Sequence, residues 1–210
     1  MATRTICICL IWLISGGAVA AQSGAPGVLP PQARPHGRSL TDLATAYMSW
    51  ALSTPPDDNP FINPRCEQSS IDPHIWFVPA SLGGEVQIVC NIPQGSFLVV
   101  LAGGIECSEA EGDGSTEAEL LACVETFFAD LTRIEATLDG TPVVLGEYVV
   151  TTLFDVIPAD SVFGPDPTPS MTKGYFFVSS PLSRGTHALR TFGEFSDGFQ
   201  AGLTTTVIVE

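Results

Sequence analysis

Residues 66–107 read CEQSSIDPHIWFVPASLGGEVQIVCNIPQGSFLVVLAGGIEC, and this stretch decides the fold. It holds three short apolar runs, at residues 74–78, 85–92 and 96–102. Turn residues separate these runs, namely Leu82-Gly83-Gly84 and then Pro93-Gln94-Gly95, and Gly103-Gly104 is expected to turn the chain after the third run. Runs of this length, rich in Val, Ile, Phe and Trp and bounded by Gly and Pro, are typical of β-strands. The sequence therefore predicts a chain organised around β-sheet.

The first 21 residues have the pattern of a secretory signal peptide. Arg4 supplies a small positive region, residues 5–14 are apolar and uncharged, and Ala18-Val19-Ala20 matches a cleavage site. The apolar run is too short for a membrane span, and the small residues at the cleavage site favour removal over an uncleaved anchor. No later run is long enough to cross a bilayer. We therefore expect a secreted protein, extracellular or periplasmic.

Composition divides the rest of the chain into two parts. Residues 22–38 are rich in Pro and Gly and contain no acid, which predicts a flexible lead-in. Residues 39–210 have the length of a single β-rich domain with a sizeable core.

The chain is strongly acidic, with a formal net charge of −15 over 210 residues. Such a surface repels nucleic acid and anionic lipid, so the sequence excludes both as partners. Acidity also keeps an exported protein soluble, and this simple interpretation is preferred to an acid-dependent function.

Four cysteines lie beyond the signal segment: Cys66, Cys90, Cys107 and Cys123. An even number in an exported chain indicates two disulfides, for which three connectivities exist. We favour Cys66–Cys90 and Cys107–Cys123, because each pair then encloses one loop. A zinc site is the weaker interpretation, since no C-x2-C spacing is present.

Two helices are expected beside the strands. Ser39 can cap a helix over residues 39–52, in which Leu43, Tyr47, Trp50 and Ala51 form one apolar face. Thr116 and Glu119 form a capping box before a second amphipathic run that extends to Leu131. Tyr47 and Trp50 are alternatively an aromatic platform for a ligand, although an aromatic stripe at helical spacing is more often core.

The C-terminal half returns to β structure. Short strands are expected at residues 134–138, 143–145, 148–154, 174–180, 186–192 and 203–209, with long loops at 158–173 and 195–202. Eight or nine short strands with two helices predict a mainly β fold, a β-sandwich or jelly roll with the helices packed on it. The expected core comprises Trp76, Val86, Ile88, Leu98, Val100, Val124, Phe127, Phe128, Ile134, Leu138, Val149, Phe176, Leu189 and Val207.

An ordered series of motifs resembles a family of secreted bacterial proteins of unassigned function. The series is Trp50, Asn59-Pro60, Cys66, Ile75-Trp76-Phe77, Gly83-Gly84, Cys90, Pro93-x-Gly95 and Cys107. The family shares a tryptophan helix, an Asn-Pro turn and a Trp-Phe strand between cysteines. It has a Lys soon after the Pro-x-Gly turn, where this chain has Ser96. The resemblance covers residues 47–123 and implies an extracellular β-rich domain, without a catalytic residue to transfer.

An acidic run follows the third strand, and it suggests a calcium loop. The run comprises Glu106, Glu109, Glu111, Asp113, Glu117 and Glu119. Glu109, Glu111 and Asp113 can take the first three ligand positions of an EF-hand-like loop, with Gly114 at the sixth. The twelfth position is Leu120 instead of a bidentate Glu, so the match is incomplete. The alternative is that these acids charge the start of the following helix. No other cofactor is expected.

The usual catalytic signatures are missing from the sequence, including G-x-S-x-G, H-E-x-x-H, the P-loop and the dinucleotide fingerprint. His74 and His187 each lie near a strand start and would share a metal if those strands were neighbours. Aromatic side chains that can stack on sugars include Trp50, Tyr148 and Tyr175, whereas Trp76 is expected in the core.

We expect a secreted, disulfide-stabilised binding module for a glycan or a surface protein, without catalysis. A hydrolase or lyase that acts on an extracellular polysaccharide through paired carboxylates is the alternative. A purely structural domain is the third interpretation.

Overall fold

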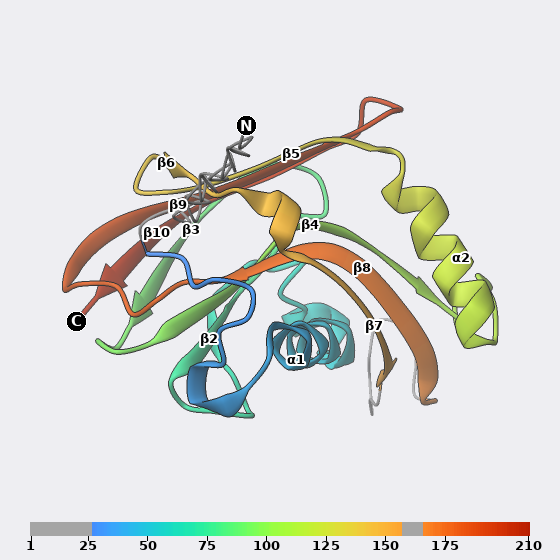
Figure 1. Cartoon of the computed structure of the whole chain (residues 1–210), viewed down its shortest axis with the longest axis horizontal. Coiled ribbons are helices and arrows are strands. Elements are labelled where there is room, and N and C mark those ends of the chain that lie inside the picture. Colours follow the sequence, from blue (N-terminus) through green and yellow to red (C-terminus); the bar gives the residue numbers. More distant parts are fainter. Residues whose placement is uncertain (1–26, 157–165) are drawn as a thin grey trace, which may run out of the picture.

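A computed structural model describes residues 27–156 and 166–210, and these residues form a β-sandwich with two α-helices (Figure 1). The helices are α1 (Leu40–Ser53) and α2 (Glu117–Phe128), and the short 3-10 turns are η1 (Pro35–Gly37), η2 (Pro56–Asp58) and η3 (Leu145–Glu147). The strands are β1 (Glu67–Gln68), β2 (Ile75–Val78), β3 (Gly84–Ile92), β4 (Phe97–Ser108), β5 (Leu131–Leu138), β6 (Thr141–Pro142), β7 (Val149–Val156), β8 (Thr168–Val178), β9 (Gly185–Phe195) and β10 (Gln200–Val209). The signal segment expected at residues 1–21 lies outside the described residues.

The strands form two five-stranded sheets, which we call the first and the second sheet. The first has the order β1-β2-β4-β8-β7 and the second the order β3-β10-β9-β5-β6. The β2–β4 and β3–β10 pairs are parallel, and the other pairs are antiparallel. The predicted mainly β fold class is therefore confirmed.

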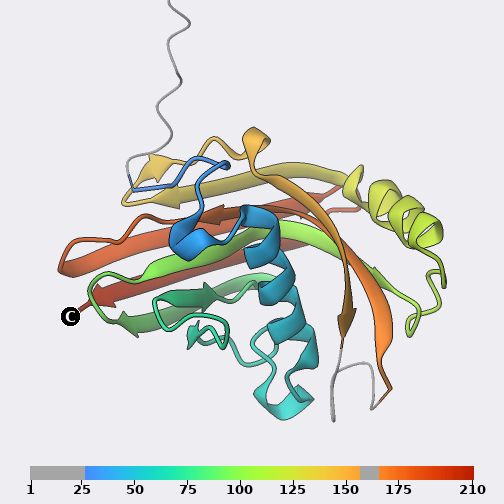
Figure 2. The same cartoon turned by 60° about the horizontal axis from the view of Figure 1, so that its bottom comes forward.

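The helices have separate positions on this sandwich. Helix α1 packs on the first sheet, chiefly against β7, and covers the face that is turned away from the second sheet (Figures 1 and 2). Helix α2 connects the end of β4 to the start of β5, and so crosses from the first sheet to the second at one end of the molecule (Figure 1). The predicted Ser39 cap and the predicted capping box of Thr116 with Glu119 are both present, and Asp42 completes a second capping box with Ser39.

Both favoured disulfides are present. Cys66–Cys90 connects the segment before β1 to β3, and Cys107–Cys123 joins β4 to α2. Disulfides form and persist in oxidising compartments, so the two bonds indicate a non-cytoplasmic location. Within residues 27–156 and 166–210, no helix combines the length and apolar content needed to cross a membrane.

The core largely follows the expected alternation, with two errors. Leu98, Val100, Val124, Leu138, Phe176, Leu189 and Val207 are buried, and Trp76, Val86, Ile88, Phe128 and Ile134 are partly buried. Val149 and Phe127 were wrongly expected in the core, since their side chains are 39% and 50% exposed. Val149 begins the edge strand β7. Phe127 lies in the last turn of α2, beyond the part of the helix that Leu120 and Val124 press onto β4 and β8.

Two segments expected as loops contribute to the folded domain. Residues 168–173, predicted as part of a long surface loop, are the first half of β8, where Thr172 pairs with both Glu106 and Thr152. The prolines of that segment, including Pro169 within β8 itself, concealed the strand. Residues 27–38 differ from a free lead-in, because Leu29 N–H donates to the Val178 carbonyl at 2.8 Å and Pro35 is buried.

Candidate functional site

The site begins with a strand edge that β2 leaves open. Strand β2 pairs with β4 only from Phe97 to Val100, and the chain then leaves the first sheet for β3 in the second. Beyond Val100, β4 continues for eight residues to Ser108, paired on its other side with β8. Among the described strands, none pairs with β4 on the β2 side over residues 101–108. We call this segment the free edge of β4.

The two faces of the free edge look toward different parts of the molecule. Glu106 pairs with Thr172, which pairs with Thr152, and the Thr152 hydroxyl lies 2.9 Å from that of Thr45 on α1. Glu106 therefore faces the α1 side. The neighbouring Ile105 pairs with Lys173, which contacts Glu125 on α2. Successive side chains along the edge thus alternate between an α1 side and an α2 side.

A cleft of about 650 Å³ surrounds this edge, and we call it the edge cleft. Its α1 side includes Met48, Leu52 and Phe61, and its other side includes Leu131, Phe195 and Leu203. Residues 101–106 of β4 run through its lining. The volume and apolar character are typical of ligand sites in proteins.

Four large apolar side chains at the edge cleft are exposed to solvent, and we call them the mouth residues. They are Ile62, Leu82, Phe127 and Phe199, with exposed fractions of 52%, 60%, 50% and 46%. They come from four separate places: the turn after η2, the β2–β3 connection, α2 and the β9–β10 turn. Exposed apolar groups gathered at one place mark an interaction site better than the same groups scattered singly.

The charged residues of the edge cleft are all acidic. They are Glu106, Glu111, Asp130 and Asp197, and no Lys, Arg or His lines the cleft within the described part of the chain. Asp130 also ties the β9–β10 turn to the end of α2, because its carboxylate accepts a hydrogen bond from Ser196 Oγ at 3.0 Å. The cleft thus combines an apolar surface with negative potential.

Glu106 is the most perturbed of these acids. Burial raises its pKa from the ordinary 4.5 to about 8, the charges of Glu111 and Asp113 add to the rise, and the nearby Ser170 hydroxyl opposes it. Glu106 Oε1 is buried without a hydrogen-bond partner among the described residues. Burial also raises the pKa of Glu111, with Asp113 again contributing. Glu106 is therefore protonated at neutral pH unless a cation approaches it.

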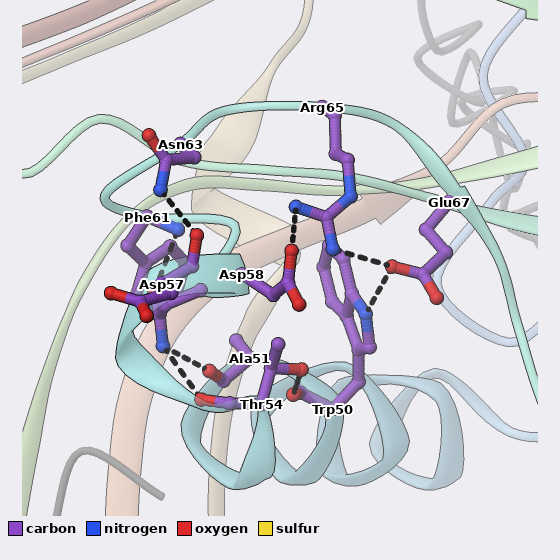
Figure 3. A network of polar contacts seen from close by, with 10 residues as sticks. Trp50, Ala51, Thr54, Asp57, Asp58, Phe61, Asn63, Arg65 and Glu67 are labelled. Carbon is purple, nitrogen blue, oxygen red and sulfur yellow. Dashed lines mark hydrogen bonds and ion pairs between the residues drawn. The ribbon is translucent and has the colours of Figure 1, made fainter.

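The Asn-Pro turn contributes Asn59, Phe61 and Ile62 to one wall of the edge cleft. Figure 3 shows the polar contacts around this turn. Asn59 is buried, and its amide donates to the Ala51 carbonyl at 2.7 Å, at the C-terminal end of α1. Its side-chain oxygen accepts from Phe61 N–H at 2.9 Å. Asn59 thus satisfies the helix end and directs Phe61 and Ile62 toward the cleft. Nearby, Trp50 Nε1 donates to Glu67, which also pairs with Arg65 (Figure 3).

The predicted aromatic ligand residues do not meet in one place. Tyr47 is fully buried, with its ring 5.7 Å from that of Phe176. Tyr148 is buried and donates its hydroxyl to the Leu29 carbonyl at 2.8 Å. Trp50 and Tyr175 are partly buried, and Tyr175 packs on Phe128 at 5.2 Å. None of the four lines the edge cleft.

The strands that the two histidines start or belong to, β2 and β9, lie in different sheets, so they are not neighbours and the condition for a shared metal site is not met. His74 is exposed just before β2, and its ring lies 5.0 Å from that of His36. His187 in β9 pairs with the Asp139 carboxylate at 2.7 Å, and this hydrogen bond raises the pKa of His187.

The three predicted calcium ligands, Glu109, Glu111 and Asp113, have different surroundings. Asp113 accepts a hydrogen bond from Ser108 N–H at 3.1 Å, Glu109 is exposed, and Glu111 lines the edge cleft. In the described part of the chain, the one group of metal-donor atoms is Cys107, Asp113 and Cys123, whose sulfurs are joined in a disulfide. Calcium binding stays a prediction for direct titration.

The sequence-based reasoning missed the edge cleft itself. Glu106 stood in the acidic run without a distinguishing pattern, and the four mouth residues lie up to 137 positions apart, from Ile62 to Phe199. Comparisons with protein-family models, with curated proteins and with solved structures found no match.

Proposed function

We propose that this chain is a secreted, non-catalytic binding module whose ligand occupies the edge cleft. The observation that carries this proposal is the apolar cleft with its four exposed mouth residues at the free edge of β4. Leaving this much apolar surface in water costs free energy, which a ligand recovers on binding. The signal pattern and the two disulfides support export, and the resemblance to a secreted bacterial family agrees with it.

A neutral apolar dye tests the cleft before any natural ligand is known. N-phenyl-1-naphthylamine should bind the protein saturably, with increased fluorescence. The double variant Phe127→Ser, Phe199→Ser removes two mouth residues and should weaken this binding by about tenfold or more, because roughly 1.4 kcal/mol of apolar contact is lost.

The matched control is Val89→Ser with Leu153→Ser, which removes two side chains of similar exposure, 59% and 41%, outside the edge cleft. It should leave dye affinity unchanged. Equal dye binding by both double variants and the parent protein would place the apolar site elsewhere and overturn the proposal.

A polysaccharide hydrolase or lyase is the second candidate, favoured by Glu106 and Glu111. Two carboxyl groups in one cleft, one with its pKa raised to about 8, are the elements of general acid–base catalysis on glycans. The test incubates the protein with insoluble polysaccharides and follows both depletion of protein and release of soluble sugar. Sugar release that Glu106→Gln abolishes would establish the enzyme, whereas depletion alone supports the binding module.

A further inference from the structure

We propose that the occupant of the edge cleft is an extended peptide segment with both basic and apolar side chains, added as a strand to the free edge of β4. This inference rests on the proposed function and names the chemistry of the ligand. It is carried by three features of the same place: an unpaired strand edge, apolar side chains on both sides of that edge, and carboxyl groups without a basic residue among the described lining.

The strand edge supplies the first reason. An unpaired strand presents a row of backbone N–H and C=O groups that readily pair with another chain. Here residues 101–106 of β4 lie within the lining of the cleft instead of on a covered border. An added strand would continue the first sheet at the point where β2 stops, next to Val100. Backbone pairing of this kind provides affinity, and pockets for alternate side chains provide specificity.

The two sides of the edge supply the second reason. Side chains of an added strand alternate between the faces of the sheet. Those on the α1 side would meet Glu106 beside Met48 and Phe61, and those on the other side would meet Phe127 and Phe199 beside Asp130 and Asp197. A segment that carries both basic and apolar residues therefore finds matching groups on each side.

The charge of the cleft supplies the third reason. Its four carboxyl groups have no basic neighbour in the cleft lining. A Lys or Arg brought next to Glu106 would favour ionisation of this buried carboxyl. Without such a cation, its pKa of about 8 keeps it protonated at neutral pH. A second copy of this chain fits poorly, because the whole chain carries a net charge of −15.

The experiment uses a fluorescent, acetylated and amidated heptapeptide in which lysine alternates with leucine, with binding followed by anisotropy. Two matched peptides test the contributions of charge and of backbone pairing separately. One has glutamate in place of lysine, and the other carries N-methyl groups on alternate backbone nitrogens. N-methylation removes strand donors but keeps every side chain and charge. Each change should weaken binding by about tenfold or more, equivalent to roughly 1.4 kcal/mol.

Protein variants locate the contact. The double variant Glu106→Gln, Glu111→Gln should bind the lysine peptide more weakly than the parent protein does. Glu147→Gln changes an exposed acid outside the cleft and should leave the affinity for this peptide unchanged. The lysine peptide should also displace the naphthylamine dye from the parent protein.

The outcomes separate the two proposals. Dye binding that depends on Phe127 and Phe199, without peptide binding or displacement, would overturn the peptide inference and leave the binding function in place. Equal affinity for the plain and N-methylated peptides would overturn strand addition. Depletion of the protein by an insoluble glycan that also displaces the dye, with no peptide binding, would replace the peptide by a sugar polymer. If the variant Phe127→Ser, Phe199→Ser bound both the dye and the peptide as tightly as the parent protein does, both proposals would be overturned.

Discussion

Single residues in this protein differ in whether their polar atoms are satisfied. Asn59 is buried with both ends of its amide bonded, and it anchors the end of α1. Tyr148 is buried with its hydroxyl bonded to Leu29. Glu106 Oε1 is buried without a partner among the described residues, at the edge of a cleft. A buried polar atom without a partner costs free energy, and such cost is often associated with a functional site.

Glu106 makes stability depend on pH in a definite direction. Its folded pKa of about 8 lies above the ordinary 4.5, so the unfolded chain releases this proton first as pH rises. Stability should therefore fall between about pH 4.5 and 8 through this group. Glu106→Gln should match the parent protein at pH 5 and exceed its unfolding free energy by on the order of 2 kcal/mol at pH 9.

Urea unfolding followed by tryptophan fluorescence at both pH values measures this effect. Glu147→Gln is the control and should show no pH-dependent difference from the parent protein. A difference between Glu106→Gln and the parent that is the same at pH 5 and pH 9 would show that Glu106 titrates normally in the folded protein.

Among the elements, helix α2 affects both the stability of the protein and the shape of the edge cleft. It buries only Leu120 and Val124, so packing alone holds it weakly. The Cys107–Cys123 bond and the ion pair between Lys173 and Glu125 fasten it to β4 and β8. The last turn of this helix then presents Phe127 at the mouth of the cleft.

Removing the Cys107–Cys123 bond should therefore affect both stability and binding. Replacing both cysteines by Ser opens a loop with a sequence separation of 16 and should cost about 3 kcal/mol of unfolding free energy. Dye affinity should fall as well, because α2 is released. The control replaces Cys66 and Cys90, with a separation of 24, and should lower stability similarly while dye affinity is kept. Equal loss of dye binding in both variants would mean that α2 does not position the site.

At the scale of the whole molecule, the N-terminal segment is part of the domain. Residues 27–38 cross the sandwich, where Gly27 O accepts from Ser180 N–H and Leu29 bonds to both Val178 and Tyr148. His36 also pairs with Asp72 at 2.8 Å. These contacts hold the segment against the first sheet and against the turn that precedes β2.

A chain that begins at residue 39 should consequently be less stable than one that begins at residue 27. The loss should be about 2–4 kcal/mol, from the lost hydrogen bonds of Gly27 and Leu29 and the burial of Pro35. Thermal unfolding of the two chains measures it. Equal melting temperatures would show that the segment adds nothing to the domain.

Sequence by itself determined most of the strands, both helices, the capping box of Thr116 with Glu119 and the favoured disulfide pairs. These depend on local patterns: alternation at period 2, an apolar face at period 3.6, and cysteines that enclose short loops. The error at residues 168–173 arose because a proline-rich segment conceals a strand that pairs with the preceding strand β7 and with β4, which lies far away in the chain. The turn expected at Gly103-Gly104 is also wrong, because both residues pair with β8 inside β4.

Tertiary structure alone decided the site. The mouth residues Ile62, Leu82, Phe127 and Phe199 come from four connections, and only the packing of two sheets brings them together. The free edge of β4 exists because β2 is shorter than β4, a property of pairing rather than of either segment. The raised pKa of Glu106 likewise comes from burial among distant neighbours. Local patterns carry no record of such non-local contacts, because each contact depends on how the completed sheets are placed.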